Sequence, residues 1–529
     1  MKEQQTQYFK NGKIFKEPGY FCEAMGIKDG KILWTGKNDE IKDANAIDLK
    51  DSIVIPAFID SHTHPDMVAK NIDSVPCLPP LVNSIEDIIK ALKNSALLNG
   101  DENQWIEGFG WDENVLKEKK SPTCKDLDRA STTQPIMIYQ SSYHIISCNT
   151  KALKIAGIDK DTPDPKEGKI GRFENGEPNG IFYEPAAIDL IRNKMKPQTS
   201  EDIIRQILKL GKKYDKLGIS AVCDMFCDYE PIDRFQIYTE AKKQGFSQKV
   251  VLYYVWSHIK KNGKKPIVKT KGDISIAGIK LFLDGSISGR TAFMKKNYPN
   301  SNERGMKLMD EKELLEAVDY ARKNQLQMAI HVMGDASIQF LIDTLKDIQP
   351  WIEDAPTIRL EHASILSRDQ LKEMKESKMT FALAPQPIFL FAEYEAYKNN
   401  LDQDLLEIAY GIKTDDEFVL TSLSSDAPAT LWANPENLYY TLQASVDRTS
   451  ANHHDINKKE AIDVQKAIQM LSINGAKISA IPNLGKLEVG YEASFQILDK
   501  DIFTIPSNQL GKILPKEVWL QGERKYLRD

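Results

Sequence analysis

Short apolar runs typical of buried β-strands recur through the middle of the chain, and this recurrence constrains the fold more than any other feature. Most gaps between the runs contain a segment of helical periodicity, such as Leu314–Asn324 or Arg368–Lys378. Strands that alternate with helices predict an α/β fold with a parallel sheet, and eight such strands are what a closed (β/α)8 TIM barrel requires. The predicted strands are Ile53–Ile59, Gly218–Met225, Val250–Val255, Ile276–Leu283, Gln327–Met333, Thr357–His362, Met379–Ala384 and Phe418–Ser424.

Both ends of the chain have a different character, with short alternating runs separated by turns that contain glycine. Such runs are typical of small antiparallel sheets. We therefore expect a composite β-sandwich domain built from residues 1–52 and 485–529, and a barrel domain of residues 53–484. The terminal runs are Lys13–Phe15, Ala24–Lys28, Lys31–Trp34, Ala493–Leu498 and Glu517–Gln521.

One connection, residues 65–217, is far too long for a βα unit: it has roughly 150 residues where about 30 suffice. It contains two strand-like pieces, Gln104–Phe109 and Pro135–Gln140, and a polar stretch rich in glycine and proline, Asp159–Gly180. We expect a long insertion after the first barrel strand. Because it follows the end of that strand, we expect it to lie over the active site.

The charge and composition of the chain indicate which kinds of molecule it is expected to bind. The chain has 70 Lys and Arg against 76 Asp and Glu, without a basic block, which argues against binding to nucleic acid. Neither a signal peptide nor an apolar run long enough for a bilayer is visible. We expect a cytoplasmic protein with a small-molecule substrate, no nucleic acid and no membrane, and we allow for a homodimer. Cys223 and Cys227 have no second pair, so we interpret them as buried thiols.

The positions of the eight histidines point to a metal site. His62 and His64 are two residues apart at the end of the first predicted strand, so both imidazoles face the same way. Alone, this pair is as often a surface turn, and a single histidine at a strand end is more often a hydrogen-bonded structural residue. His331, His362 and Asp426 also fall at strand ends, where the catalytic groups of a barrel collect. A set of four histidines and one aspartate suits zinc or another first-row divalent ion.

Lys280 is unusual because it lies inside an apolar predicted strand, in the same alternation phase as Asp284. A bare ammonium next to divalent cations would be repelled, whereas a lysine that has reacted with CO2 carries a carbamate that bridges two metals. A salt bridge to Asp284 and a direct substrate contact remain alternatives.

Six motifs are distributed along nearly the whole chain: Val54–His64, Trp105–Glu113, Ile279–Ser286, His331–Ala336, Arg359–Ala363 and Ser425–Pro428. Together they resemble the amidohydrolase superfamily of metal-dependent hydrolases, in its YtcJ-like branch that contains N-substituted formamide deformylases. The resemblance implies a TIM barrel carrying a composite β-sandwich, and an enzyme acting on carbon–nitrogen bonds other than peptide bonds. It also implies a metal centre made of His62, His64, carbamylated Lys280, His331, His362 and Asp426.

Two segments depart from the family pattern. Ala493-Ser494-Phe495 stands where many relatives have Ala-Asp-Leu, which concerns only the sandwich domain. The segment Ala384–Pro387 lacks the histidine often found just after Gln-Pro, which predicts a different substrate side of the pocket.

Further candidates for substrate binding come from segments that resemble the family or lie near the predicted strand ends. For Trp111 and His144 a buried structural role is at least as plausible as a substrate contact, and Arg290 is equally suited to pair with a neighbouring carboxylate. The candidates are Trp111, His144, Glu184, Asp284 and Arg290.

These observations lead to one functional hypothesis. One or two divalent ions, with zinc favoured, lower the pKa of water so that hydroxide is available at neutral pH. Asp426 serves as general base and then as general acid in the cleavage of an N-substituted amide. An ester, a cyclic amide or a deaminase substrate on the same centre is the alternative within enzymes, and a non-catalytic binding or signalling protein that keeps the barrel is the alternative outside them.

Overall fold

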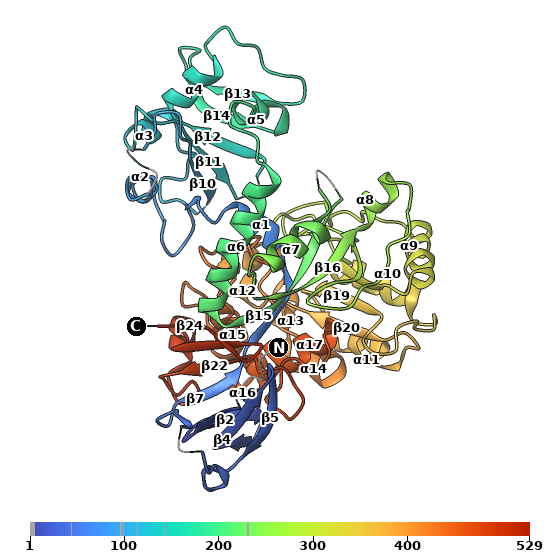
Figure 1. Ribbon diagram of the computed structural model, residues 1–529. Coiled ribbons are helices and arrows are strands. Elements are labelled where there is room, and N and C mark those ends of the chain that lie inside the picture. The colour runs from blue at the N-terminus through green and yellow to red at the C-terminus, as the bar shows by residue number, and fades with distance from the viewer. Residues whose placement is uncertain are drawn as a thin grey trace. The chain divides into compact units, whose positions relative to one another are not determined.

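The computed structural model describes residues 6–43, 45–95, 98, 100–113, 115–141, 143–229 and 232–528 (Figure 1). The chain divides into two compact units. Unit 1 consists of Met1–Pro65, Ile207–Thr430 and Pro435–Asp529, and unit 2 consists of Asp66–Gln206 and Leu431–Asn434.

An eight-stranded parallel sheet forms the centre of unit 1, in the order β21-β20-β19-β18-β17-β16-β15-β8. The eight strands and the alternation with helices confirm the predicted α/β, TIM-like fold. Helices α9 (Glu311–Lys323) and α11 (Arg368–Glu376) match the two segments of helical periodicity. The strands are β8 (Phe58–Thr63), β15 (Ile219–Cys227), β16 (Lys249–Val255), β17 (Ile274–Phe282), β18 (Gln327–Val332), β19 (Ile358–His362), β20 (Phe381–Ala384) and β21 (Leu420–Thr421). The other helices of the barrel region are α6 (Ser200–Leu217), α7 (Arg234–Lys243), α8 (Trp256–Lys261), α10 (Asp335–Leu345), α12 (Ile388–Asn400), α13 (Gln403–Ile408), α14 (Ile412–Phe418), α15 (Leu438–Val446), α16 (Val464–Gln469) and α17 (Gly475–Ile478).

The first predicted strand, Ile53–Ile59, is wrong as a single element. It is two strands, β7 (Ile53–Pro56) and β8, which belong to different sheets. The chain changes sheets at Ala57, because the Ala57 amide donates to the carbonyl of Ser494 whereas the next amide, at Phe58, donates to Gly218. His62 therefore lies within a barrel strand, and His64 follows its end.

The last predicted strand, Phe418–Ser424, is reduced to the two residues of β21, since α14 extends to Phe418. Beyond β21 the chain runs beside β8 instead: the amide of Asp426 donates to the carbonyl of His62, and the amide of His64 donates to the carbonyl of Ala427, both at 2.8 Å. These two bonds bring the first strand and the last segment of the barrel together at the candidate site.

A buried cluster of mainly apolar side chains lies within the barrel region. Cys223, Tyr253 and Ala329 belong to this cluster, and Ile481 packs against it. Cys223 and Cys227 are buried and free, as expected for buried thiols.

Two further sheets of unit 1 combine the two ends of the chain, whose blue and red strands lie together in Figure 1. Phe9 of the first sheet packs edge-on against Phe495 and Trp519 of the second, at centroid distances of 5.4 and 5.2 Å. The two sheets therefore share one apolar core. The first sheet contains β1 (Gln7–Lys10), β4 (Ala24–Lys28), β5 (Lys31–Gly36) and β6 (Ile47–Asp48), and the second contains β2 (Lys13–Glu17), β3 (Tyr20–Cys22), β7, β22 (Phe495–Leu498), β23 (Glu517–Leu520) and β24 (Glu523–Leu527).

Unit 2 has a six-stranded mixed sheet and cores of its own. Along β11, Ile136 and Ile138 pack into one cluster with residues of α2, whereas Met137 packs into another with residues of α4 and α5. Successive residues of a strand face opposite sides, so helices cover both faces of this sheet. Its elements are α1 (Pro65–Lys70), β9 (Val75–Pro76), α2 (Ile85–Lys93), β10 (Ile106–Trp111), α3 (Cys124–Asp128), β11 (Ile136–Gln140), β12 (Ile145–Cys148), α4 (Thr150–Ala156), β13 (Lys169–Arg172), β14 (Pro178–Tyr183) and α5 (Pro185–Arg192).

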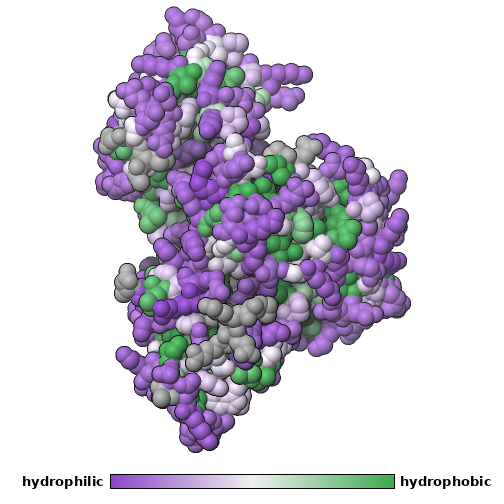
Figure 2. Space-filling model, in the orientation of Figure 1, coloured by the Kyte–Doolittle hydropathy of each residue, from purple (hydrophilic) through white to green (hydrophobic). Residues whose placement is uncertain are grey.

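The face of the molecule in Figure 2 is mostly hydrophilic, with apolar residues in scattered patches. Within the described part of the chain, no helix combines the length and the apolar character that crossing a bilayer requires. The location of the protein in the cell stays a prediction.

Candidate metal centre

Four imidazoles lie close together where strands β8, β18 and β19 end. The ring centroids of His62 and His64 are 5.5 Å apart, and those of His62 and His362 are 4.7 Å apart. His331 is the penultimate residue of β18, and its ring centroid lies 4.4 Å from that of His362. The predicted cluster of histidines thus exists as a compact group.

Asp426 lies among these rings. Its Oδ1 is 3.2 Å from Nε2 of His62 and 2.9 Å from Nε2 of His64, and its Oδ2 is 3.8 Å from Nδ1 of His362. One donor atom from each of His62, His362 and Asp426 falls within 4.8 Å of the others, which is the spacing a single metal ion needs.

Lys280 extends from β17 into the same region and is buried, with 1% of its surface exposed. Its Nζ lies 5.3 Å from the ring centroid of Phe282 and has no hydrogen-bond partner within the described chain. The Asp284 carboxylate instead accepts hydrogen bonds from the backbone amides of Phe293, Met333 and Gly334 at 2.9 to 3.0 Å. Its Oδ1 also lies 3.8 Å from Nε2 of His331. These contacts do not support the predicted alternative of a Lys280–Asp284 salt bridge.

The electrostatics of the cluster favour neutral imidazoles at His331 and His362 beside an ionised Asp426 carboxylate. Burial lowers the pKa of His331 to about 4 and that of His362 well below its usual range. Burial alone would raise the pKa of Asp426, but the neighbouring His62 and the contacts from His62 and His64 hold it well below its ordinary value. Burial also lowers the pKa of Lys280 to about 8. Neutral imidazoles and an ionised carboxylate are the forms that bind a cation.

The donor set fits a divalent metal ion. Nε2 of His62, Oδ1 of Asp426 and Nζ of Lys280 are buried, and none of them makes a hydrogen bond of good geometry within the described residues. Buried polar atoms of this kind need an explanation, and an ion is one of those expected. Imidazole nitrogen and carboxylate oxygen are the ligands that zinc and similar ions prefer.

Glu361 and Arg359 hold the imidazole of His62 in position. The sequence analysis did not predict this role. Oε2 of Glu361 lies 2.6 Å from Nδ1 of His62, and its Oε1 accepts a hydrogen bond from Nε of Arg359 at 2.8 Å. Burial alone would raise the pKa of Glu361, but Arg359 and His62 lower it to about 2. A carboxylate on the far nitrogen of a metal-binding histidine fixes the ring and its tautomer. Two charged residues inside the apolar run 357–362 were the signal that could have revealed them.

Gln386 has a corresponding role for His362, whose Nδ1 lies 2.7 Å from the Gln386 Oε1. This residue belongs to the segment Ala384–Pro387, which departs from the family pattern. In this segment, which lacks the histidine often found just after Gln-Pro, the side-chain amide of Gln386 contacts the proposed metal ligand His362.

The remaining candidates for substrate binding do not belong to the histidine cluster, and they lie in both units. In unit 1, Arg290 is exposed and its Nε donates to Oδ1 of Asn400 at 2.7 Å. In unit 2, Trp111 is fully buried and its indole N–H donates to the carbonyl of Ile138, which favours a structural role. His144 and Glu184 pair at 2.9 Å, and both side chains are more than half exposed. A substrate contact by any of these residues stays a prediction.

Comparison with known proteins identifies the class to which this fold and site belong. The chain belongs to the amidohydrolase family, whose model matches residues 45–526. It is 26% identical to a protein of Bacillus subtilis (strain 168) named as an amidohydrolase, YtcJ, over 96% of this chain and 97% of that one. It is 23% identical to the N-substituted formamide deformylase of Arthrobacter pascens, over 96% and 95% of the two chains.

Among solved structures, an uncharacterized metal-dependent hydrolase from Pyrococcus horikoshii OT3 superposes with a TM-score of 0.75 at 26% identity, covering 95% of this chain and 99% of that one. The resemblance inferred from the motifs is thus confirmed. The protein is an enzyme, a metal-dependent hydrolase of carbon–nitrogen bonds.

Proposed function

We propose that the protein hydrolyses a non-peptide amide, in the first instance an N-substituted one, with Asp426 as general base and then general acid. The observation that carries this proposal is the convergence of His62, His64 and His362 on the buried Asp426 carboxylate. The similarity to the N-substituted formamide deformylase of Arthrobacter pascens supports the choice of substrate class.

We propose the metal ligands to be His62, His64, Lys280, His331, His362 and Asp426, with zinc as the ion and Lys280 as its carbamate. A divalent ion, when bound, lowers the pKa of water and polarises the carbonyl of the substrate. A carbamate on Lys280 would give its buried Nζ an anionic group that can bridge two ions. The absence of a hydrogen-bond partner for this atom among the described residues supports that assignment.

The chain's own groups would carry the proton transfers. Asp426 lies between the imidazoles of His62 and His64, and this position supports a role for its carboxylate in taking a proton from the attacking water. It then returns the proton to the leaving nitrogen, which must be protonated before the carbon–nitrogen bond breaks. Glu361 and Gln386 hold the rings of His62 and His362 in place through their Nδ1 atoms.

The domain plan belongs to the same proposal. We propose that the two terminal sheets form the composite β-sandwich, with residues 1–52 and 485–529 as its frame and β7 as a further strand of it, and that residues 65–217 are an insertion after the first barrel strand. The apolar core shared by the two terminal sheets supports the first part. The separate cores of unit 2 support the view that the insertion is a folded unit.

The proposal is tested by assaying purified, zinc-loaded protein against N-formyl amines, N-acyl amines, cyclic amides and matched esters, with release of the amine or acid as the measurement. We expect turnover of N-substituted amides. Turnover of esters or cyclic amides alone would refute the substrate class.

The Asp426→Asn variant is the internal control for that screen. Asn keeps the size and one oxygen of Asp but cannot accept a proton at neutral pH. We expect kcat to fall by about 10²–10⁴, the usual effect of losing a positioned base, while the bound zinc, measured by elemental analysis, is largely retained. Unchanged turnover would assign the proton transfer to another group or the activity to a contaminant.

A further inference from the structure

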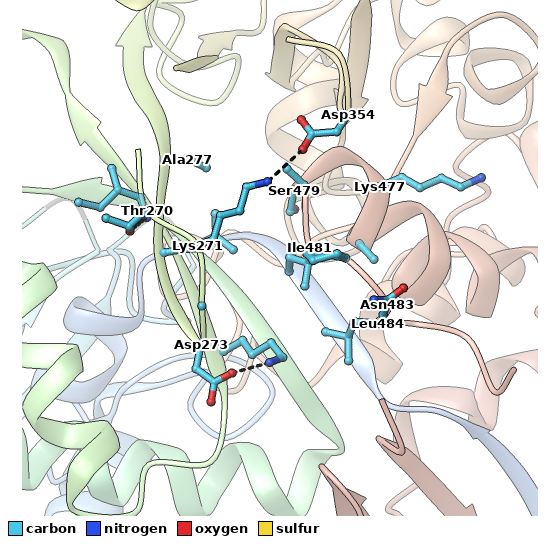
Figure 3. A pocket seen from close by; sticks show the side chains of 18 of the residues that line it. Thr270, Lys271, Asp273, Ala277, Asp354, Lys477, Ser479, Ile481, Asn483 and Leu484 are labelled. Atoms are coloured by element: carbon cyan, nitrogen blue, oxygen red, sulfur yellow. Dashed lines mark hydrogen bonds and ion pairs between the residues drawn. The ribbon is translucent and has the colours of Figure 1, made fainter. Parts of the chain in front are cut away.

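Figure 3 shows a cavity of about 420 Å³ that is lined by residues from the starts of barrel strands, whereas the proposed metal centre lies where the strands end. Lys249 and Val251 line it from the start of β16, and Ser275 and Ala277 line it from the first half of β17, ahead of Lys280. None of the six proposed metal ligands is among its lining residues. Its volume is in the range of pockets that hold small organic molecules.

The floor of this pocket is apolar. Ile481, which lies in the middle of Figure 3, packs against two buried clusters of the barrel. Val251 and Ala277 come from one of these clusters, and Ala476 and Leu484 come from the other. An apolar ligand group placed here would be removed from water on several sides.

The rim of the pocket is rich in lysine: five lysines and two aspartates line it. Lys269 and Lys271 each approach Asp354 no closer than 4.0 Å, so one carboxylate is shared by two ammonium groups at the limit of ion-pair distance. Lys249 is more firmly held, 2.5 Å from Asp273 and 3.0 Å from Glu492. The remaining two are Lys477, whose ammonium points away from the pocket in Figure 3, and Lys486, which lies 3.5 Å from Glu488.

We propose that this pocket is a binding site for an organic anion, a molecule with an apolar body and one carboxylate or phosphate group. The apolar body would lie on Ile481 and Leu484, and the anionic group would be held by Lys269 and Lys271. Loosely paired ammonium groups lose little by exchanging their carboxylate for a ligand, since exposed ion pairs contribute little free energy. The proposal is independent of the substrate at the metal centre.

The test is isothermal titration of the zinc-loaded, full-length protein with defined probes. Octanoate and octyl phosphate combine both features, whereas acetate, inorganic phosphate and octanol each have only one. We expect one molecule of octanoate or octyl phosphate to bind, and each of the other three to bind at least tenfold more weakly. Each methylene between hexanoate and octanoate should tighten binding by about two- to fourfold, as expected for burial in an apolar pocket.

Variants locate the binding. Lys269→Glu/Lys271→Glu should weaken octanoate binding at least tenfold. The control Lys372→Glu/Lys398→Glu, with the same change of charge at exposed positions that do not line the pocket, should leave it unchanged. Thermal melting checks that both variants are folded, and Lys269→Gln/Lys271→Gln replaces the first pair if it is not. Octanol binding as tightly as octanoate, or octanoate binding that resists the pocket variants but is lost in His62→Ala/His64→Ala, would overturn the proposal.

Discussion

At the residue scale, the backbone at two of the proposed ligands departs from regular strand geometry. His362 and Asp426 have φ angles of 68° and 53°, in the left-handed region that non-glycine residues avoid. In a regular strand Glu361 and His362 would face opposite sides, yet both approach His62, at 2.6 Å and at a centroid distance of 4.7 Å. The unusual φ at His362 allows two consecutive side chains to meet the same ring. Such backbone outliers cost about 1–3 kcal/mol each and cluster at functional sites.

Glu361→Gln tests whether Glu361 orients His62. Gln retains an oxygen for Nδ1 of His62 but loses the charge that opposes Arg359. We expect the affinity for zinc, measured by competition with a chromogenic chelator, to fall about 10- to 100-fold, as is usual when the partner of a ligating histidine is changed.

The matched control for this variant separates orientation from stability. Glu361→Gln leaves the buried guanidinium of Arg359 without its carboxylate, which by itself is destabilising by about 3–5 kcal/mol. Adding Arg359→Met removes that unpaired charge, so the double variant should regain thermal stability while its zinc affinity stays low. Recovery of both quantities together would mean that Glu361 has only a structural role.

Lys280→Ala distinguishes a carbamate from a plain ammonium. If Lys280 is carbamylated, the variant loses an anionic ligand and leaves a gap beside the imidazoles. Acetate or propionate should then restore part of the activity in the presence of zinc, because carboxylate oxygens suit divalent ions, and methylamine or ethylamine should have no effect. Rescue by amines but not by acids would refute the carbamate and leave the four histidines and Asp426 as ligands.

At the element scale, sequence patterns predicted most barrel strands because each is a short apolar run bounded by helical segments. They failed at the first and last strands for identifiable reasons. The run Ile53–Ile59 is continuous in hydrophobicity, but its hydrogen bonds change from one sheet to the other at Ala57. At the other end, the run Phe418–Ser424 looks like a strand, but its serines make hydrogen bonds outside the barrel sheet. For example, Oγ of Ser422 donates to the carbonyl of Met470. Hydrogen-bond partners distant in sequence are not visible in hydropathy.

The segment that carries Asp426 is fixed to β8 through Asp60 and Ser425. The Asp60 carboxylate accepts hydrogen bonds from the Ser425 hydroxyl at 2.5 Å and from the Ser425 amide at 3.0 Å, and both residues are buried. Ser425→Ala leaves a buried carboxylate with one donor fewer, which costs about 1–3 kcal/mol. We expect this loss in the free energy of unfolding by urea, measured on metal-free protein.

A double-mutant cycle with Asp60→Asn assigns that loss to the pair. The two residues are in direct contact, so their effects should not add, and the coupling energy should be about 1 kcal/mol or more. Strict additivity would mean that the bond between β8 and the Asp426 segment contributes nothing to stability.

At the scale of the whole molecule, sequence reasoning found the residues proposed as metal ligands more readily than the residues that surround them. The four histidines and Asp426 stand at strand ends and Lys280 lies within a strand, and all six are chemically distinctive, so a barrel topology was enough to bring them together. Glu361 and Gln386 act through contacts with residues 299 and 24 positions away, and no pattern in one sequence specifies such contacts. The long insertion was predicted from its length alone, whereas its mixed sheet with two cores required the structure.

Metal removal should affect the stability of the whole barrel, because the proposed ligands come from β8, β17, β18 and β19 and from the segment after β21. An ion that binds only to the folded state stabilises that state by RT ln(1 + [L]/Kd), which is about 2.7 kcal/mol when the free ion is at a hundred times Kd.

Protein purified without chelator should contain one to two equivalents of a divalent transition ion, and prolonged dialysis against a chelator should lower its melting temperature reversibly. His62→Ala/His64→Ala should stay folded, because its apolar barrel core is unchanged, and should lack most of the metal. It should therefore melt at the same temperature with and without chelator. A chelator-induced shift of equal size in that variant would place the stabilising ion elsewhere in the chain and exclude His62 and His64 as its ligands.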